Sequence, residues 1–146
     1  MATDDADYSV DGDQAVTDMI QHERLSIGIG CFSRACSDDV IRLIEASVDQ
    51  IPSGSMIATL DRRASMGEIV ASILGLRLVL FPASILANVA GVTTHSPLAL
   101  SKTQTTNVAE ASALASLGPS ARLIVPQTKG RFCTCAVAAL PVTVRP

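Results

Sequence analysis

The chain of 146 residues is 48% hydrophobic and holds three Phe, one Tyr and no Trp. This suits one compact domain and disfavours a single-strand nucleic-acid binder, which needs aromatic side chains for base stacking. The net charge of −3 divides into −7 on residues 1–23 and +4 on residues 24–146. This division predicts a disordered acidic segment followed by a basic domain. The expected ligand of that domain is an anion of modest size and not a nucleic acid.

Hydrophobic patterning in residues 24–146 predicts strands alternating with helices. Apolar residues alternate with polar ones from Leu25 to Ile29, which indicates a strand, and Gly28 and Gly30 predict a turn at its end. The other expected strands are Met56–Leu60, Arg77–Phe81, Ala121–Val125 and Phe132–Leu140. The expected helices are one capped by Ser37, one with a capping box of Ser65 and Glu68 that ends at Gly75, a short one over Ser84–Ala90, and one capped by Asn107 with Glu110.

The connections between these elements predict the fold class. Residues 126–131 are too few for a crossover between parallel strands, so the last two strands form an antiparallel hairpin. We therefore expect an α/β fold: a single three-layer α/β/α domain with a mixed, mostly parallel sheet of about five strands and an antiparallel C-terminal strand. The Thr- and Ser-rich residues 91–106 predict a long loop, in which His95 and Ser96 could cover a site.

Cysteine spacing and the N-terminal composition bear on cellular location. Cys31, Cys36, Cys133 and Cys135 are not spaced like zinc ligands, so we expect reduced, structural thiols and no metal site. The acidic, polar N-terminus lacks the features of a signal peptide, which favours a cytoplasmic protein.

One apolar stretch, Ile69–Val92, is long enough to span a bilayer. A charge at Arg77 is costly there, and Gly75 and Pro82 interrupt the stretch where a helix, a strand and another helix would join. We therefore expect no membrane insertion.

The glycine pair after the first strand is compatible with two roles. A dinucleotide-binding fingerprint requires a third glycine where Ser33 stands, so a nucleotide module is disfavoured. The turn either brings an anion to the next helix N-terminus or is only a tight connection. Cys31 is a candidate nucleophile, because thiol pKa values fall near helix N-termini, but a packing role is the alternative.

Basic residues follow several expected strands. Arg34 follows the first strand, Arg62 and Arg63 the second, and Lys129 and Arg131 flank Gly130 in the expected hairpin loop. Ligands of open α/β sheets bind beyond the carboxyl ends of the strands, so these cations would share one rim. Such a rim suits a ligand with several carboxylates, although solvated surface loops are the alternative for each residue alone.

The sequence resembles a small cobalamin-biosynthesis family that comprises the stand-alone CobE protein and the C-terminal domain of the lactone hydrolase CbiG. The similarity covers about Leu25 to Leu140 and rests on four motifs in order: GIGC at 28–31, ATLDRR at 58–63, NVAEASAL at 107–114 and VPQTKG at 125–130. The sequence departs from the family where Phe32, Ser33 and Arg34 replace two basic residues and a glycine, and where Met66 replaces an acid.

The resemblance implies a ligand of the precorrin or corrinoid class, a tetrapyrrole with many acetate and propionate groups. The expected ligand-binding residues are Gly28, Gly30, Cys31, Arg34, Arg63, Asn107, Lys129 and Gly130. We expect no cofactor on the protein itself, cobalt only within the tetrapyrrole, and other cobalamin-pathway enzymes as partners. A hydrolase acting on the precorrin ring lactone, with Cys31 or Glu110 as its reactive group, is the alternative, although capping already explains Glu110.

Overall fold

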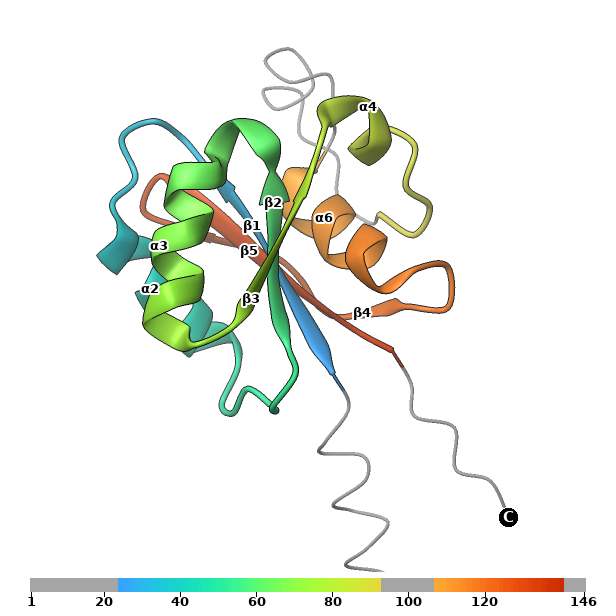
Figure 1. The fold of residues 1–146 in the computed structure, drawn as a ribbon, viewed down its shortest axis with the longest axis horizontal. Coiled ribbons are helices and arrows are strands. Elements are labelled where there is room, and N and C mark those ends of the chain that lie inside the picture. Colours follow the sequence, from blue (N-terminus) through green and yellow to red (C-terminus); the bar gives the residue numbers. More distant parts are fainter. Residues whose placement is uncertain (1–23, 93–106, 141–146) are drawn as a thin grey trace, which may run out of the picture.

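The computed structural model describes residues 24–92 and 107–140 (Figure 1). Its strands are β1 (Leu25–Cys31), β2 (Met56–Leu60), β3 (Arg77–Phe81), β4 (Arg122–Gly130) and β5 (Cys133–Ala139). Its helices are α2 (Ser37–Ser47), α3 (Ala64–Leu74), α4 (Ala83–Leu86) and α6 (Val108–Leu117), with a 3-10 turn at Asp61–Arg63.

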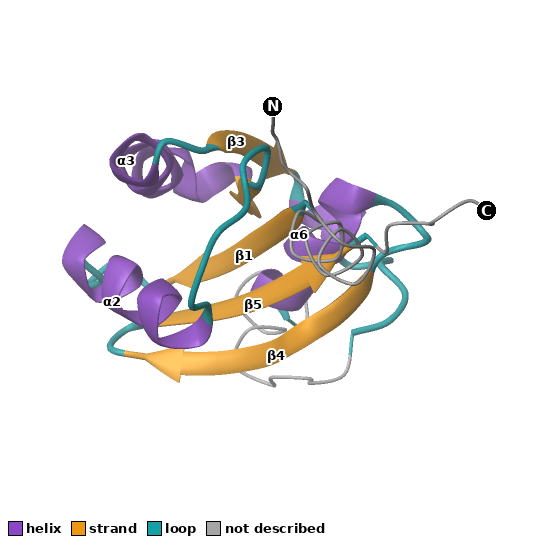
Figure 2. Cartoon of the chain, turned by 90° about the horizontal axis from the view of Figure 1, so that it is seen from below, coloured by secondary structure: helices purple, strands orange, loops and turns teal. Residues whose placement is uncertain are grey.

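The five strands form one sheet in the order β3-β2-β1-β5-β4. β1, β2 and β3 are parallel, and β5 runs antiparallel to both β1 and β4, so that Leu25 at the start of β1 lies opposite Ala139 at the end of β5. Helices α2 and α3 cover one face and α6 the other (Figures 1 and 2). This arrangement confirms the expected α/β fold with a mixed, mostly parallel sheet.

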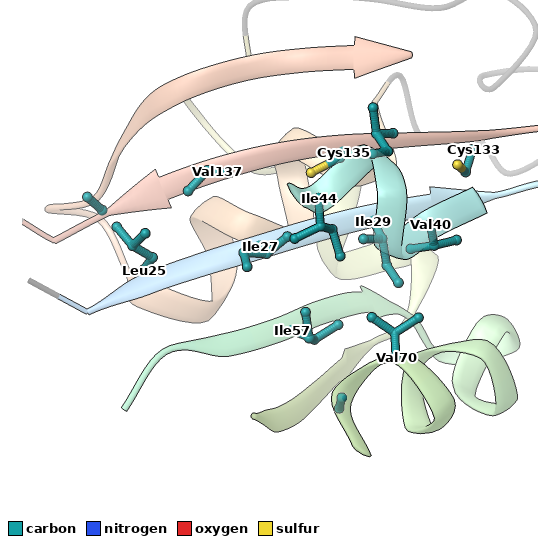
Figure 3. Close-up of a cluster of buried hydrophobic side chains, with 13 residues drawn as sticks. Leu25, Ile27, Ile29, Val40, Ile44, Ile57, Val70, Cys133, Cys135 and Val137 are labelled. Carbon is teal, nitrogen blue, oxygen red and sulfur yellow. The ribbon is translucent and has the colours of Figure 1, made fainter. Parts of the chain in front are cut away.

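The main hydrophobic core lies between the sheet and the α2–α3 layer (Figure 3). Ile27 and Ile29 of β1 point to this face with Ile57 and Val137, and all four are fully buried. Burial of such side chains contributes about 1.5–3 kcal/mol each. The opposite face of β1 carries small residues, which allow α6 to lie close against the sheet.

The structure corrects the expected glycine turn. β1 continues through Gly28 and Gly30 to Cys31, and all three residues pair with β5. The glycines are therefore strand residues, and the chain leaves the sheet only after Cys31. Packing against α6, which a strand pattern does not reveal, explains the small size of Gly28.

The connection between the last two strands is also shorter than expected. β4 extends to Gly130, so Pro126 and Lys129 lie in a strand and only Arg131 and Phe132 form the turn. β4 is an edge strand with two register irregularities between Leu123 and Thr128, a position where proline is tolerated.

Helix boundaries agree with the sequence in part. Gly75 ends α3 with a φ of +70°, as expected for a left-handed C-terminal residue. The expected capping box of Ser65 and Glu68 is wrong, because the preceding 3-10 turn leads directly into α3 at Ala64 and makes Arg63 the N-cap. The expected short helix begins at Ala83 and ends at Leu86.

The apolar stretch Ile69–Val92 divides into the end of α3, the strand β3 and the short helix α4. Across residues 24–92 and 107–140, no helix has both the length and the apolar character needed to cross a membrane. The expected acidic segment at residues 1–23, and most of the expected loop with His95 and Ser96, lie outside the described residues.

Candidate functional site

The carboxyl ends of β1, β2, β3 and β4 lie along one edge of the sheet. Helix α6 begins at this edge, because its Val108 lies beside Gly30, whereas its Ser116 hydrogen-bonds with Ser26 near the start of β1. The edge therefore combines strand ends with the positive end of a helix dipole, which are the usual elements of a ligand site in an α/β sheet. We call it the carboxyl edge.

Five basic residues lie at or just after strand ends at the carboxyl edge. Arg34 lies in the β1–α2 loop, Arg62 and Arg63 lie in the 3-10 turn after β2, and Lys129 and Arg131 lie at the end of β4 and in the following turn. Arg34, Lys129 and Arg131 are exposed, and Arg63 is half-buried. The structure thus brings together the cations that the sequence suggested for one rim, although Lys129 occupies a strand.

Strand register places Lys129 relative to its neighbours. Lys129 pairs with Thr134 of β5, and Thr134 pairs with Gly30 of β1. Paired residues share a face of a sheet, so the three lie in a row on the face that α6 covers, next to the N-terminal end of that helix. Gly130 faces the other way, where a Cβ atom would lie 3.0 Å from a methyl group of Leu43 in α2.

Gly28 of β1 allows α6 to approach the sheet, whereas Gly30 leaves room for a side chain of the neighbouring strand β5. A Cβ atom on Gly28 would lie 1.9 Å from the backbone oxygen of Ala109, and one on Gly30 would lie 2.7 Å from Oγ1 of Thr134. Gly28 is buried under the helix, so the surface proposed below excludes it. Gly30 is only half-buried and remains at the edge.

Asn107 and Glu110 fix the beginning of α6. The Asn107 side chain accepts a hydrogen bond of 2.9 Å from the Glu110 backbone N–H, which confirms the expected cap. The Glu110 carboxylate, itself fully buried, accepts a hydrogen bond of 2.7 Å from the backbone N–H of Gln127. Gln127 lies where β4 departs from regular pairing with β5. Glu110 therefore supplies the hydrogen-bond acceptor for its N–H that a neighbouring strand would otherwise provide.

Cys31 lies opposite Cys133 in the β1–β5 pair. Burial raises the pKa of Cys31 to about 12; the charge of a Cys133 thiolate also raises it, and Arg63 opposes the shift. The expectation of a lowered thiol pKa is therefore wrong, because α2 begins six residues later and its N-cap is Cys36. Cys31 is a protonated thiol near neutral pH and thus a poor nucleophile.

The buried thiols predict a loss of stability in alkali. Burial, the largest cause in each case, raises the pKa of Cys31 and Cys135 to about 12 and that of Cys133 to about 11, from 9.0 for a free thiol. Above pH 9 the unfolded chain releases thiol protons that the native state keeps. The contribution of these thiols to the free energy of unfolding is therefore fully present below pH 9, and it is lost as the pH rises toward 11 to 12. The slope is about 1.4 kcal/mol per pH unit for each such thiol.

Urea unfolding between pH 7.5 and 10.5, in the presence of a reducing agent, measures this loss. The variant Cys135→Ala is the comparison, because Cys135 is fully buried and the substitution removes one of the three thiols. Its free energy of unfolding should fall less steeply with pH than that of the wild type. Equal slopes for the two proteins would contradict the assignment.

The turn between β4 and β5 contributes a feature that the sequence reading missed. The ring of Phe132 lies under the guanidinium carbon of Arg34 at 4.8 Å and near that of Arg131 at 5.6 Å, measured to the ring centroid. The sequence predicts a loop over residues 126–131 and a strand that begins at Phe132, whereas the structure has a two-residue hairpin turn of Arg131 and Phe132. An edge strand tolerates proline, so extending the fourth strand through Pro126 would have predicted the two-residue turn.

Comparison with known families identifies the domain. Residues 25–138 match the family model described as "Cobalamin synthesis G C-terminus". The chain belongs to this family. It is accordingly a protein of cobalamin biosynthesis, in agreement with the resemblance carried by its four sequence motifs.

Two solved structures of similar proteins agree with this family. The crystal structure of CobE, described as a protein from the cobalamin (vitamin B12) biosynthetic pathway, has 25% sequence identity and a TM-score of 0.72, and the match covers 84% of this chain and 94% of CobE. The cobalamin biosynthesis protein chiG from Agrobacterium tumefaciens str. C58 has 27% identity and a TM-score of 0.57, covering 78% of this chain and 96% of chiG. No curated protein matches this chain.

The side chains of the described residues also bear on metal binding. In residues 24–92 and 107–140, no three or more His, Cys, Asp or Glu side chains are grouped so that they could hold a metal ion. The carboxyl edge instead offers guanidinium and ammonium groups, which bind carboxylates and phosphates.

Proposed function

We propose that the protein binds a polycarboxylate precorrin or corrinoid intermediate at the carboxyl edge and assists its conversion or transfer to another enzyme of the pathway. The binding surface consists of the edge cations; the N-terminal end of α6 lies beside them, with its cap residue Asn107 buried. The observation that carries this proposal is the gathering of Arg34, Arg63, Lys129 and Arg131 at the strand ends of a domain from a cobalamin-biosynthesis family. Any cobalt belongs to the tetrapyrrole.

The chemistry of the edge supports carboxylate recognition. Arginine presents a planar fork that binds a carboxylate through two hydrogen bonds, and lysine adds a compact charge. The N-terminal end of α6 favours negative charge at the same place. A precursor of the corrin ring carries acetate and propionate groups around its periphery, so several of these contacts can form at once.

The alternative of a lactone hydrolase has less support. Such a reaction requires an activated nucleophile or a base in contact with the substrate. Cys31 retains its proton because its pKa is about 12, and the buried Glu110 carboxylate holds the backbone of Gln127. Nucleotide binding through a glycine turn has no support, because Gly28 and Gly30 lie within β1.

Titration of the protein with hydrogenobyrinic acid, a cobalt-free corrinoid, tests the proposal. We expect a saturable change in the visible spectrum that weakens with added salt, since the contacts are between opposite charges. Lys129→Ala should weaken binding about fivefold, the effect of about 1 kcal/mol expected from one exposed charge contact.

Arg122→Ala is the matched control for this substitution. Arg122 is also exposed and basic but lies at the amino end of β4, opposite Ala139 and away from the carboxyl edge. Its removal should leave the affinity almost unchanged. Absence of saturable binding, or equal weakening by both substitutions, would contradict a site at this edge.

A further inference from the structure

Phe132 has an unfavourable backbone conformation. Its φ is +60°, the only positive value at a non-glycine position among the described residues. A bulky side chain rarely adopts this region, and glycine is favoured at this position of a two-residue hairpin turn. Strain of this kind persists only where the surrounding structure enforces it, and it is often found at functional sites.

The contacts of Phe132 indicate what holds it in place. Its backbone oxygen accepts a hydrogen bond of 2.9 Å from the N–H of Phe32, which joins the turn to the β1–α2 loop. Figure 1 shows that loop, in blue, next to the turn between β4 and β5. Its ring belongs to none of the three buried hydrophobic clusters found in the described part of the chain. The ring therefore does not serve core packing.

The ring instead holds two guanidinium groups. Arg34 comes from the β1–α2 loop and Arg131 from the turn itself, at 4.8 and 5.6 Å from the ring centroid. The attraction between a cation and an aromatic face offsets part of the repulsion between two like charges. A guanidinium that stacks through its flat face keeps the N–H groups at its edge available for a carboxylate.

One acidic residue near this pair, Asp39, takes part in the cap of α2. The Asp39 carboxylate accepts hydrogen bonds from Sγ of Cys36 at 3.1 Å and from the Cys36 backbone N–H at 3.4 Å. The side-chain bond is the largest cause of the lowered pKa of Asp39, and Arg131 contributes less. Asp39 thus caps α2, and its charge also acts on Arg131 from that position.

We propose that Arg34 and Arg131 form a clamp for two neighbouring carboxylates of one ligand, and that Phe132 is the positioning residue that fixes their spacing. The clamp rests on the function proposed above for its natural ligand, a tetrapyrrole whose acetate and propionate groups lie side by side. The clamp is the part of the carboxyl edge that would select a ligand with two adjacent carboxylates over a ligand with one.

Phe132 variants separate positioning from folding. Phe132→Leu removes the ring and should weaken binding of hydrogenobyrinic acid about tenfold, the effect of losing one charge-assisted contact. Phe132→Tyr keeps the ring and should bind like the wild type. Phe132→Gly relieves the left-handed strain, so it should melt no lower than the wild type and still bind as weakly as Phe132→Leu.

A double-mutant cycle with Arg34 tests whether Phe132 acts through the arginines. Arg34→Ala should weaken binding, and Phe132→Leu should then cost much less than it does in the wild type, because the group that it positions is gone. Independent effects of the two substitutions would overturn the clamp. So would a large loss of thermal stability in Phe132→Gly, since the ring would then be structural.

Uroporphyrin I, a carboxylate-rich porphyrin, distinguishes failure of the clamp from failure of the proposed function. If the wild type binds hydrogenobyrinic acid and Phe132→Leu binds it equally well, the clamp is wrong and the function stands. If the wild type binds only uroporphyrin, and Phe132→Leu weakens that binding, the clamp stands and the corrinoid assignment is wrong. If the wild type binds neither compound, both proposals are wrong.

Discussion

Gly28→Ala is expected to lower the free energy of unfolding by about 3 kcal/mol, the upper part of the range for overfilling a packed interior. The new methyl group would lie 1.9 Å from the backbone oxygen of Ala109 and 2.8 Å from Oγ of Ser112. A backbone carbonyl within a helix cannot rotate away as a side chain can. α6 would therefore have to move off β1, which would open its contacts with β2 and β5 as well. Urea unfolding measures the change.

Gly30→Ala is the comparison for this substitution. Its methyl group would approach Oγ1 of Thr134 at 2.7 Å, but the other atoms near it are at least 3.6 Å away. Rotation of the Thr134 side chain can relieve this single contact, so the cost should be clearly smaller than for Gly28→Ala. If Gly28→Ala is the less harmful of the two, close approach of α6 is not the reason for glycine at position 28.

Glu110→Ala is expected to cost about 2–4 kcal/mol of stability. The substitution leaves the Gln127 N–H without its 2.7 Å acceptor at a place where β4 is irregular. Removing the partner of a buried donor costs about 1–3 kcal/mol, and more where the lost partner is charged. The truncated side chain also leaves a cavity beside the start of α6. Thermal and urea unfolding of the purified variant measure the total.

Two further variants separate this structural role from a catalytic one. Glu110→Gln keeps an acceptor oxygen and should retain most of the stability, whereas a catalytic carboxylate would lose its function in this variant too. Glu68→Ala removes an exposed carboxylate of α3 and should change stability by no more than about 0.5 kcal/mol. Equal stability of Glu110→Ala and the wild type would contradict the link to β4.

Local sequence signals predicted much of the fold. β2 and β3 have the bounds that were expected, because a Pro-Ser-Gly run precedes β2, and Gly75 and Pro82 flank β3. The alternation of strands and helices predicted the α/β class, and the Asn107 cap predicted where α6 begins. In each case, residues next to one another in the chain carry the information.

The remaining features depend on residues that are distant in sequence. Gly28 resembles a turn glycine until Ala109 is placed over it, and no pattern near position 28 contains that contact. Pro126 and Lys129 have the composition of a loop, but an edge strand accepts both. The raised pKa of Cys31 follows from burial and from Cys133, about a hundred residues later in the chain.

The pairing of Leu25 with Ala139 has a consequence for work with this protein. The first strand enters the sheet beside the place where the last strand leaves it, and both points lie at the end opposite the basic loops. A surface tether, fluorescent label or fused reporter attached through either strand end will therefore face away from those loops. A short linker that joins the end of β5 to the start of β1 would also permit a circularly permuted protein with its carboxyl edge intact.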